Sequence, residues 1–240
     1  DMRGGGAFSG RMTAPLCAAG GVCLQILKRR DINISAHILR IGDISDTPYD
    51  PMRGAAEACG EFPCVSPEAA GLMKSSILAA AAEGDSLGAV IECAADGVPA
   101  GLGGPLFEGL EGRIASLLFA IPAVKGIEFG AGFEAARLRG SENSDQFVIC
   151  GGRVATATNN AGGILGGISD GMPLIFRTAI KPTPSIAKAQ RSVSLRDMTE
   201  RELKNGGRHD PCIAPRAVPV VEAAAAIALL DALLEDEDER

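Results

Sequence analysis

The stretch Ile32-Asn33-Ile34-Ser35-Ala36-His37-Ile38-Leu39 decides the fold class, because apolar and polar side chains alternate along it. A period of two places successive side chains on opposite faces, so the stretch predicts a β-strand with one buried face. The residues just before it, 13–30, are apolar on most faces and end in basic residues that suit the negative end of a helix dipole. A helix followed at once by a strand indicates a mixed α/β domain.

The rest of the chain continues this alternation of helices and strands. Ser66-Pro67-Glu68 predicts the N-cap and first turn of a helix that runs to about residue 82. Further strands are expected at 87–95, 126–130, 174–180 and 185–195, and further helices at 106–119 and from about 219 to 234. We expect loops or flaps at 42–65 and 134–152, a solvated acidic tail at 235–240, and a single domain over residues 1–240.

Composition limits the partners that this chain can have. A net charge of -7 without a basic stripe predicts no nucleic-acid partner. No uncharged apolar run approaches about 18 residues and the start shows no targeting pattern, so no membrane partner is predicted. The seven cysteines form no CxxC pair and are interpreted as reduced packing residues, which indicates a cytoplasmic setting. With only His37 and His209 available, no metal site is predicted.

A glycine-rich segment precedes the first expected helix, in Gly4-Gly5-Gly6-Ala7-Phe8-Ser9-Gly10-Arg11. Exposed backbone N–H groups at the positive end of a helix dipole favour an anion or a phosphate, and Arg11 adds a bidentate donor. The alternative is a flexible turn with a solvated arginine. The local sequence supports both interpretations equally.

A second glycine-rich segment spans residues 158–171 and contains Gly162-Gly163 and Gly166-Gly167. These pairs would let the main chain lie flat against a planar or phosphorylated ligand, and Asn159 and Asn160 could add directional amide contacts. A tight turn between strands is the alternative, and the local sequence favours it.

Two further segments carry charged groups held by prolines. Lys181-Pro182-Thr183-Pro184-Ser185 offers one ammonium and two hydroxyls, which suits a phosphate clip at a strand end or an ordinary surface loop. In Arg208-His209-Asp210-Pro211, a carboxylate two residues from a guanidinium could accept or guide a proton. The alternative, a helix-capping aspartate paired with an arginine, is favoured by the local sequence. Glu222, on the expected final helix, either pairs with an arginine or faces solvent.

Together with the stretches 84–88, 97–107 and 121–130, these segments resemble the chorismate synthases in order and spacing. Seven collinear motifs make the resemblance specific, and it covers essentially the whole chain. It implies an α/β fold of the β-α-β sandwich type, incomplete at its N-terminal side. The GESHG-type and RPGH-type segments of the family, which supply two histidines and several arginines, are not found, so the chain is expected to cover the C-terminal two-thirds of the enzyme. Leu165 stands where many relatives have glutamate.

The resemblance also implies a reaction. The family converts 5-enolpyruvylshikimate 3-phosphate to chorismate and phosphate by a 1,4-elimination that requires reduced FMN, usually as a homotetramer. NADP is associated with the family, and the sequence leaves open whether the enzyme reduces its own flavin. A catalytically inactive flavin- or anion-binding fragment is the alternative. A structural subunit without a ligand is disfavoured, because the glycine runs coincide with arginine and lysine.

The motifs carry the family's site residues onto this sequence. The implied FMN contacts are Ala7, Phe8, Ser9, Pro122, Ala123, Gly166, Lys181, Pro182, Thr183, Pro184, Ser185 and Arg208. Arg11 and Arg208 would face the substrate anion, and Asp210 would assist proton transfer near the flavin N5. A cationic site of this kind suits a substrate with two carboxylates and a phosphate, and it would stabilise the phosphate as it leaves.

Overall fold

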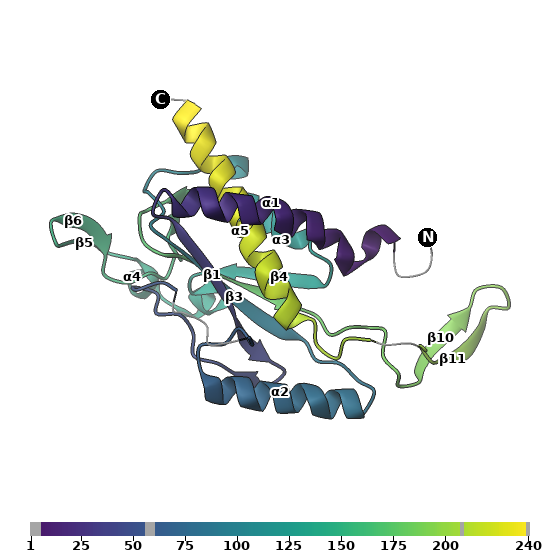
Figure 1. Cartoon of the computed structure of the whole chain (residues 1–240). Coiled ribbons are helices and arrows are strands. Elements are labelled where there is room, and N and C mark those ends of the chain that lie inside the picture. The colour runs from purple at the N-terminus through teal and green to yellow at the C-terminus, as the bar shows by residue number, and fades with distance from the viewer. Residues whose placement is uncertain (1–5, 56–60, 207–208, 239–240) are drawn as a thin grey trace.

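A five-stranded antiparallel sheet, in the order β2-β1-β3-β9-β4, forms the centre of the computed structural model (Figure 1), which describes residues 6–55, 61–206 and 209–238. Its strands are β1 (Asn33–Ile41), β2 (Ile44–Ser45), β3 (Ala89–Asp96), β4 (Val124–Phe129) and β9 (Leu174–Ile180). The α-helices are α1 (Thr13–Lys28), α2 (Pro67–Ala82), α3 (Leu110–Phe119), α4 (Gly140–Asn143) and α5 (Ala214–Asp238). Short 3-10 helices lie at η1 (Gly6–Phe8), η2 (Gly10–Met12), η3 (Leu106–Glu108) and η4 (Gly132–Arg137).

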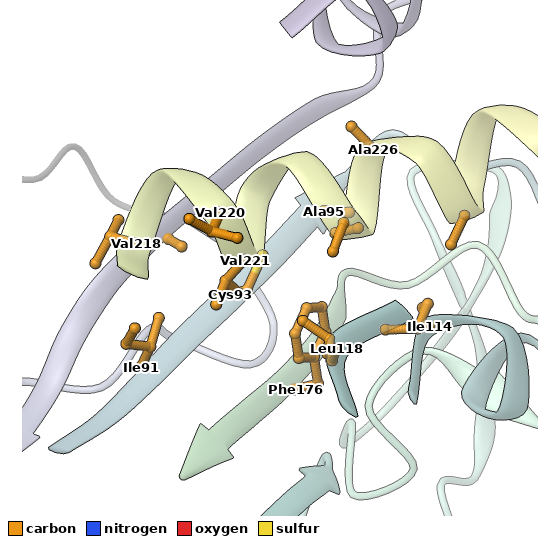
Figure 2. Close-up of a cluster of buried hydrophobic side chains, with 14 of the residues drawn as sticks. Ile91, Cys93, Ala95, Ile114, Leu118, Phe176, Val218, Val220, Val221 and Ala226 are labelled. Carbon is orange, nitrogen blue, oxygen red and sulfur yellow. The ribbon is translucent and has the colours of Figure 1, made fainter. Parts of the chain in front are cut away.

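Helices α1, α3 and α5 form one layer over one face of the sheet, while α2 lies beside the short edge strand β2 (Figure 1). The apolar face predicted by the period-two pattern points into this layer. Ile91 and Cys93 of β3 and Phe176 of β9 are fully buried in one core with Val221 of α5 and Leu118 of α3 (Figure 2). Cys93 and Phe176 are paired across the β3–β9 ladder, and both belong to the same cluster of buried side chains as α5. The sheet and α5 therefore share one continuous core.

Helix α5 is the central helix of this core. Fourteen of its residues are buried, on all sides of the helix, and such a helix belongs inside a protein core or a membrane. By length and hydropathy alone α5 could cross a membrane, yet 72% of its most apolar window is buried inside the fold. The apolar character of α5 is therefore accounted for by packing within the chain.

Most of the predicted elements are confirmed. Helices α1 and α2 and strand β9 have the expected limits, and Ser66 caps α2 through a hydrogen bond from the Ala69 amide to Ser66 Oγ. The helix expected at 106–119 is divided at Gly109 into a 3-10 turn and α3.

The predicted acidic tail is solvent-exposed in the residues that the structure describes, but it is helical, and the prediction that the helix ends at about residue 234 was wrong. Helix α5 begins five residues before Pro219, at Ala214, and continues to Asp238. The added turns are held by ion pairs, since Arg30 Nη1 lies 2.7 Å from Glu237 Oε1 and Arg113 pairs with Glu235.

Three two-stranded hairpins were not predicted as such. They are β5 (Phe147–Cys150) with β6 (Arg153–Thr156), β7 (Ile164–Leu165) with β8 (Ile168–Ser169), and β10 (Gln190–Ser194) with β11 (Thr199–Leu203). The segments expected at 134–152 and 185–195 each contribute one strand of a hairpin. Cys150 is exposed at the end of β5, so its interpretation as a packing residue was wrong.

Glu222 adopts neither of the arrangements considered for it. Its Oε1 accepts a hydrogen bond of 2.8 Å from the Ala36 amide of β1, which joins α5 to the strand. Burial raises the pKa of Glu222, and the hydrogen bond from Ala36 only partly opposes this. The folded protein therefore holds the Glu222 proton more tightly than the unfolded chain does.

A Glu222→Gln substitution is expected to raise the melting temperature at neutral pH. The ionised carboxylate is disfavoured by burial, whereas glutamine keeps a carbonyl acceptor for the Ala36 amide. A raised folded-state pKa makes stability fall as pH rises from about 4.3, the ordinary value for glutamate, through the folded pKa. The gain should therefore shrink toward pH 4 in calorimetric scans. Glu202→Gln on the exposed strand β11 is the control, and an equal gain from it would contradict the explanation.

Candidate functional site

A turn at residues 84–88, just before β3, holds two of the predicted site segments together. Ser86 Oγ donates a hydrogen bond of 2.7 Å to the Thr183 carbonyl. The Leu87 amide donates one of 2.7 Å to the Pro211 carbonyl. The Lys181–Ser185 segment and the start of α5 are therefore fixed side by side at one end of the sheet.

The Lys181–Ser185 segment is also tied to the start of β4. The Lys181 amide donates a hydrogen bond of 2.9 Å to the Ala123 carbonyl. Ala123 has a φ of 78°, a left-handed conformation that costs a non-glycine residue roughly 1–3 kcal/mol and is common at ligand sites. The sequence analysis assigned both Ala123 and Lys181 to the cofactor, and the structure places them in contact.

Two polar groups in the Lys181–Ser185 segment have no partner in the described part of the chain. The Lys181 ammonium forms no ion pair or hydrogen bond with any described residue, although the residue is only partly exposed. Thr183 Oγ1 is buried and makes no hydrogen bond. A buried hydroxyl without a partner is costly unless a ligand or water satisfies it. A free cation next to such a hydroxyl fits a phosphate group.

Asp210 lies at the same end of the sheet, just ahead of α5. Its Oδ2 is 2.6 Å from Arg216 Nη1, so the aspartate is paired with an arginine as the alternative interpretation expected, but with Arg216. Arg208, the arginine singled out from the sequence, lies outside the described residues. The neighbouring His209 Nε2 is buried without a partner in the described chain.

The segment before α1 points toward this end of the sheet. Strand β1 begins at Asn33, which pairs with Asp96 at the end of the sheet far from Lys181. Helix α1 ends just before β1 begins, so its N-terminal end is directed toward the Lys181 end of the sheet. Ser9 Oγ accepts a hydrogen bond of 3.2 Å from the Arg11 amide. Ala7, Phe8 and Arg11 are exposed, and the Arg11 guanidinium has no ion-pair partner among the described residues. Gly4 and Gly5 lie outside the described residues.

Gly166 lies at the opposite end of the sheet from Lys181. It forms the β7–β8 turn with Gly167, with φ values of 62° and 90°. The Gly167 carbonyl accepts a hydrogen bond of 3.0 Å from the Leu110 amide at the start of α3. Asn159 is occupied within the protein as well, since its Nδ2 donates to the Pro51 and Pro173 carbonyls. Within one chain the structure therefore does not bring Gly166 together with the other predicted site residues.

Comparison with known proteins identifies the family. The family model described as chorismate synthase matches residues 1–234. The chain belongs to the chorismate synthase family. Chorismate synthases of Dehalococcoides mccartyi and Thermococcus gammatolerans are 48% and 50% identical to it over 235 and 234 residues. In each case the match covers 98% of this chain and 65% of the relative, so the chain spans about 65% of the length of these relatives.

A solved structure supports the fold assignment. The crystal structure of a chorismate synthase superimposes with a TM-score of 0.77 at 32% sequence identity, over 95% of this chain and 65% of that one. The predicted mixed α/β fold of the chorismate synthase type is therefore confirmed. The described residues supply one five-stranded sheet and its helical layer, and a second sheet of comparable size is not among them.

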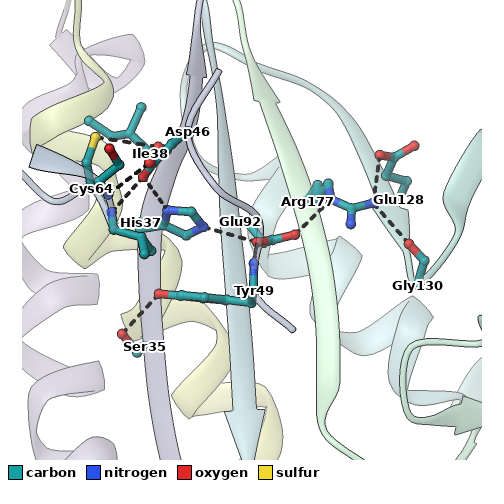
Figure 3. Close-up of polar contacts among 12 residues, drawn as sticks. Ser35, His37, Ile38, Asp46, Tyr49, Cys64, Glu92, Glu128, Gly130 and Arg177 are labelled. Carbon is teal, nitrogen blue, oxygen red and sulfur yellow. Dashed lines mark hydrogen bonds and ion pairs between the residues drawn. The ribbon is translucent and has the colours of Figure 1, made fainter. Parts of the chain in front are cut away.

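The sequence analysis missed a largely buried polar row on the face of the sheet opposite the helical layer, defined by Asp46, His37, Glu92, Arg177 and Glu128. His37 lies 3.2 Å from Asp46 and 3.0 Å from Glu92, and Arg177 lies 2.9 Å from Glu92 and 3.4 Å from Glu128 (Figure 3). The strand positions of His37, Glu92, Arg177 and Glu128 are directly opposite one another in the ladder. The row therefore joins β1, β3, β9 and β4 through polar side chains.

This polar row borders a hollow of about 350 Å³. Arg40, Asp46, Glu128 and Arg177 are among its lining residues, and none of the described site residues implied by the chorismate synthase motifs lines it. The hollow reaches Arg40 and Val90, one residue from the ends of β1 and β3 at which Ala89 pairs with Ile180, so it lies near the end of the sheet where Lys181 lies.

Proposed function

We propose that this chain contributes the FMN cradle and the Asp210 side of a chorismate synthase site, which converts 5-enolpyruvylshikimate 3-phosphate to chorismate and phosphate. The observation that carries the proposal is the end of the sheet where Ala123, Lys181, Thr183 and Asp210 are linked through the 84–88 turn. Membership of the chorismate synthase family supplies the reaction, a 1,4-elimination that loses the C6 proton and the 3-phosphate.

The described residues fit the phosphate end of a flavin. The unpaired Lys181 ammonium and the buried Thr183 hydroxyl would hold a phosphate group, and the prolines on either side of Thr183 keep that segment stiff. The Ala123 backbone and Phe8 would contact the planar part of the cofactor. Bound reduced FMN would lend electron density transiently to the reacting substrate.

The substrate side of the site consists of fixed charges. Arg11 and Arg208 would bind the carboxylates and the phosphate of the substrate and stabilise the phosphate as it leaves. Asp210, held in place by Arg216 and by the Pro211–Leu87 hydrogen bond, would accept or pass on a proton near the flavin N5. NADP as a source of reducing equivalents, a homotetramer, a single domain over residues 1–240 and a cytoplasmic setting belong to the same proposal.

A second candidate function is flavin or anion binding without turnover. The observation that favours it is the position of Gly166 in the β7–β8 turn. Gly166, at the far end of the sheet, would then be unable to join the FMN contacts. Both candidate functions predict FMN binding, but only the enzyme is expected to release phosphate.

Replacement of Lys181 by glutamine is expected to weaken FMN binding about tenfold to a hundredfold. A hydrogen bond to a charged group contributes about 1.5–3 kcal/mol, and the Lys181 ammonium has no other partner among the described residues. Flavin fluorescence titration measures the dissociation constant. Lys28→Gln, at the opposite end of α1, removes the same charge far from the site and should leave the affinity unchanged.

Phosphate release distinguishes the two candidate functions. The chain is incubated without oxygen with reduced FMN and 5-enolpyruvylshikimate 3-phosphate, and phosphate and chorismate are measured. Phosphate and chorismate formed by the wild-type chain but not by the Asp210→Asn variant support the enzyme as the function. FMN binding that depends on Lys181 without any phosphate release supports the binding fragment, and FMN affinity that is indifferent to Lys181 contradicts both.

A further inference from the structure

His37 lies in the polar row with a carboxylate on each side of its ring (Figure 3). Its Nδ1 is 3.2 Å from Asp46 Oδ2, and its Nε2 is 3.0 Å from Glu92 Oε2. All three side chains are fully buried. A neutral imidazole has one N–H donor and one bare nitrogen, so it can donate to only one of two ionised carboxylates. The two contacts together therefore require one more proton within this group of three side chains.

The surroundings of Asp46 favour its ionised form. Asp46 Oδ2 accepts a hydrogen bond of 2.6 Å from the Val65 amide, and Oδ1 accepts one of 2.9 Å from the Ser66 amide. Hydrogen bonds from backbone amides stabilise a carboxylate relative to a carboxylic acid. Both oxygens of Asp46 are thus occupied by donors, and the additional proton does not belong to this residue.

Glu92 is held in its ionised form as well. Its Oε2 accepts a hydrogen bond of 2.6 Å from the Tyr49 amide, and its Oε1 accepts one of 2.9 Å from Arg177 Nε. Burial would raise the pKa of Glu92, but its hydrogen bonds and the charge of Arg177 lower the pKa below the usual value. The site left for the additional proton is the imidazole ring of His37.

We propose that His37 is an imidazolium in the folded protein, and that its second ring proton holds the start of helix α2 against the sheet. The charge of His37 fixes Asp46, and Asp46 holds the amides of Val65 and Ser66, the residue that caps α2. The ring of Tyr49 lies 4.3 Å from that of His37 and closes the same cluster. Loss of the proton would set a bare nitrogen against a buried carboxylate, and these contacts would weaken together. The inference is independent of FMN binding and of turnover.

The other ionisable groups around His37 and its two carboxylates come from several elements: Tyr49, Cys64, Lys74 of α2, Arg177 of β9 and Glu222 of α5. Burial raises the pKa of Tyr49, and burial with a neighbouring carboxylate raises the pKa of Cys64 to about 12. Lysine and arginine keep their charge throughout the range in which a histidine titrates. Burial also raises the pKa of Glu222, on the other face of β1, so the Glu222→Gln variant is needed to separate its titration from that of His37.

The test begins with the protonation state of His37 in the full chain, which nitrogen-15 NMR spectra of histidine-labelled protein report directly. The chain contains two histidines, and replacing either one by glutamine assigns the signals. Both ring nitrogens of His37 are expected to carry protons at about pH 7.5, above the ordinary histidine value of about 6.5.

Hydrogen exchange then measures what the proton holds in place. As His37 loses its second proton at higher pH, the protection of the Tyr49, Val65 and Ser66 amides should fall about tenfold, after correction for the direct effect of pH on exchange. The Phe176 amide, in strand β9 of the same sheet, is the control and should keep its protection. The same loss is expected in the Glu222→Gln variant.

Two results would overturn the proposal. One is a neutral His37 ring at about pH 7.5 in the folded protein, which is also the result if Asp46 carries the proton. The other is a deprotonation of His37 that leaves the amides of Tyr49, Val65 and Ser66 as protected as before. FMN titration of the same samples shows separately whether the proposed function fails.

Discussion

Replacing Glu92 by alanine is expected to lower the free energy of unfolding by about 3–5 kcal/mol, the usual cost of removing one member of a buried charged pair. Glu92 is fully buried and accepts hydrogen bonds from His37 Nε2 at 3.0 Å, the Tyr49 amide at 2.6 Å and Arg177 Nε at 2.9 Å. Its loss leaves these three donors without their acceptor inside the polar row. Urea denaturation at pH 7 measures the change.

The effect of Glu92→Ala should depend on pH. Burial alone would raise the pKa of Glu92, but the hydrogen bonds from His37 and Tyr49 and the charge of Arg177 outweigh it and lower the pKa. A carboxyl with a lowered folded-state pKa stabilises the fold above its unfolded pKa of about 4.3, and this contribution is lost as pH falls through the folded pKa. The difference between wild type and variant should therefore be largest at neutral pH and shrink in acid.

Glu128→Ala provides the matched comparison. Glu128 pairs with the same arginine at 3.4 Å, but its side chain is 30% exposed. A partly exposed pair contributes about 1 kcal/mol or less. Equal losses in the two variants would show that the polar row is not organised around Glu92.

The sequence predicted the sheet because its central strands are simple two-faced patterns. In β1, Ile34, Ala36 and Ile38 face the helices, while Ser35 and His37 face the other way, as the period of two requires. The polar row could have been found from the same signal. Glu92 and Arg177 each interrupt an otherwise apolar strand, and a charged residue in a buried strand needs a partner on the same face. Pairing the two required the register, which a single sequence does not provide.

The residues at which helices and strands end could not be predicted, because they depend on contacts with residues far away in the sequence. The last turns of α5 are held by Arg30 and Arg113, which lie more than a hundred residues earlier. The hairpins were missed for a related reason, since β5 is exposed along its whole length and the strand expected at 185–195 gave no sign of its partner β11. Tertiary contacts decide such boundaries rather than propensity.

The candidate site was only partly accessible from the sequence. Motif order pointed to Ala123, Lys181 and Asp210, which the structure gathers at one end of the sheet, and equally to Gly166, which lies at the other. Gly166 and Lys181 lie at opposite ends of the sheet because the seven-residue strand β9 runs between them along the sheet. No local pattern pointed to Arg216 as the partner of Asp210.

Replacing Gly20 by alanine is expected to destabilise the protein by about 3 kcal/mol, the upper part of the usual range for overpacking a core. Helices α1 and α5 cross (Figure 1), and Gly20 lies where they touch, because an added Cβ would overlap both the Cβ and the Cα of Ala223. Because a backbone atom cannot rotate away, the two helices must move apart, and α5 carries the core of the sheet with it.

The neighbouring glycine offers a control one residue away in the same helix. A Cβ at Gly21 would meet nothing within 4 Å, so Gly21→Ala should stabilise the fold by about 0.5–1 kcal/mol through helix propensity alone. Urea denaturation of both variants separates packing from propensity, since the chemical change is identical. A gain in stability from Gly20→Ala similar to that from Gly21→Ala would mean that α1 is not pressed against α5, and that the close crossing does not hold the helical layer together.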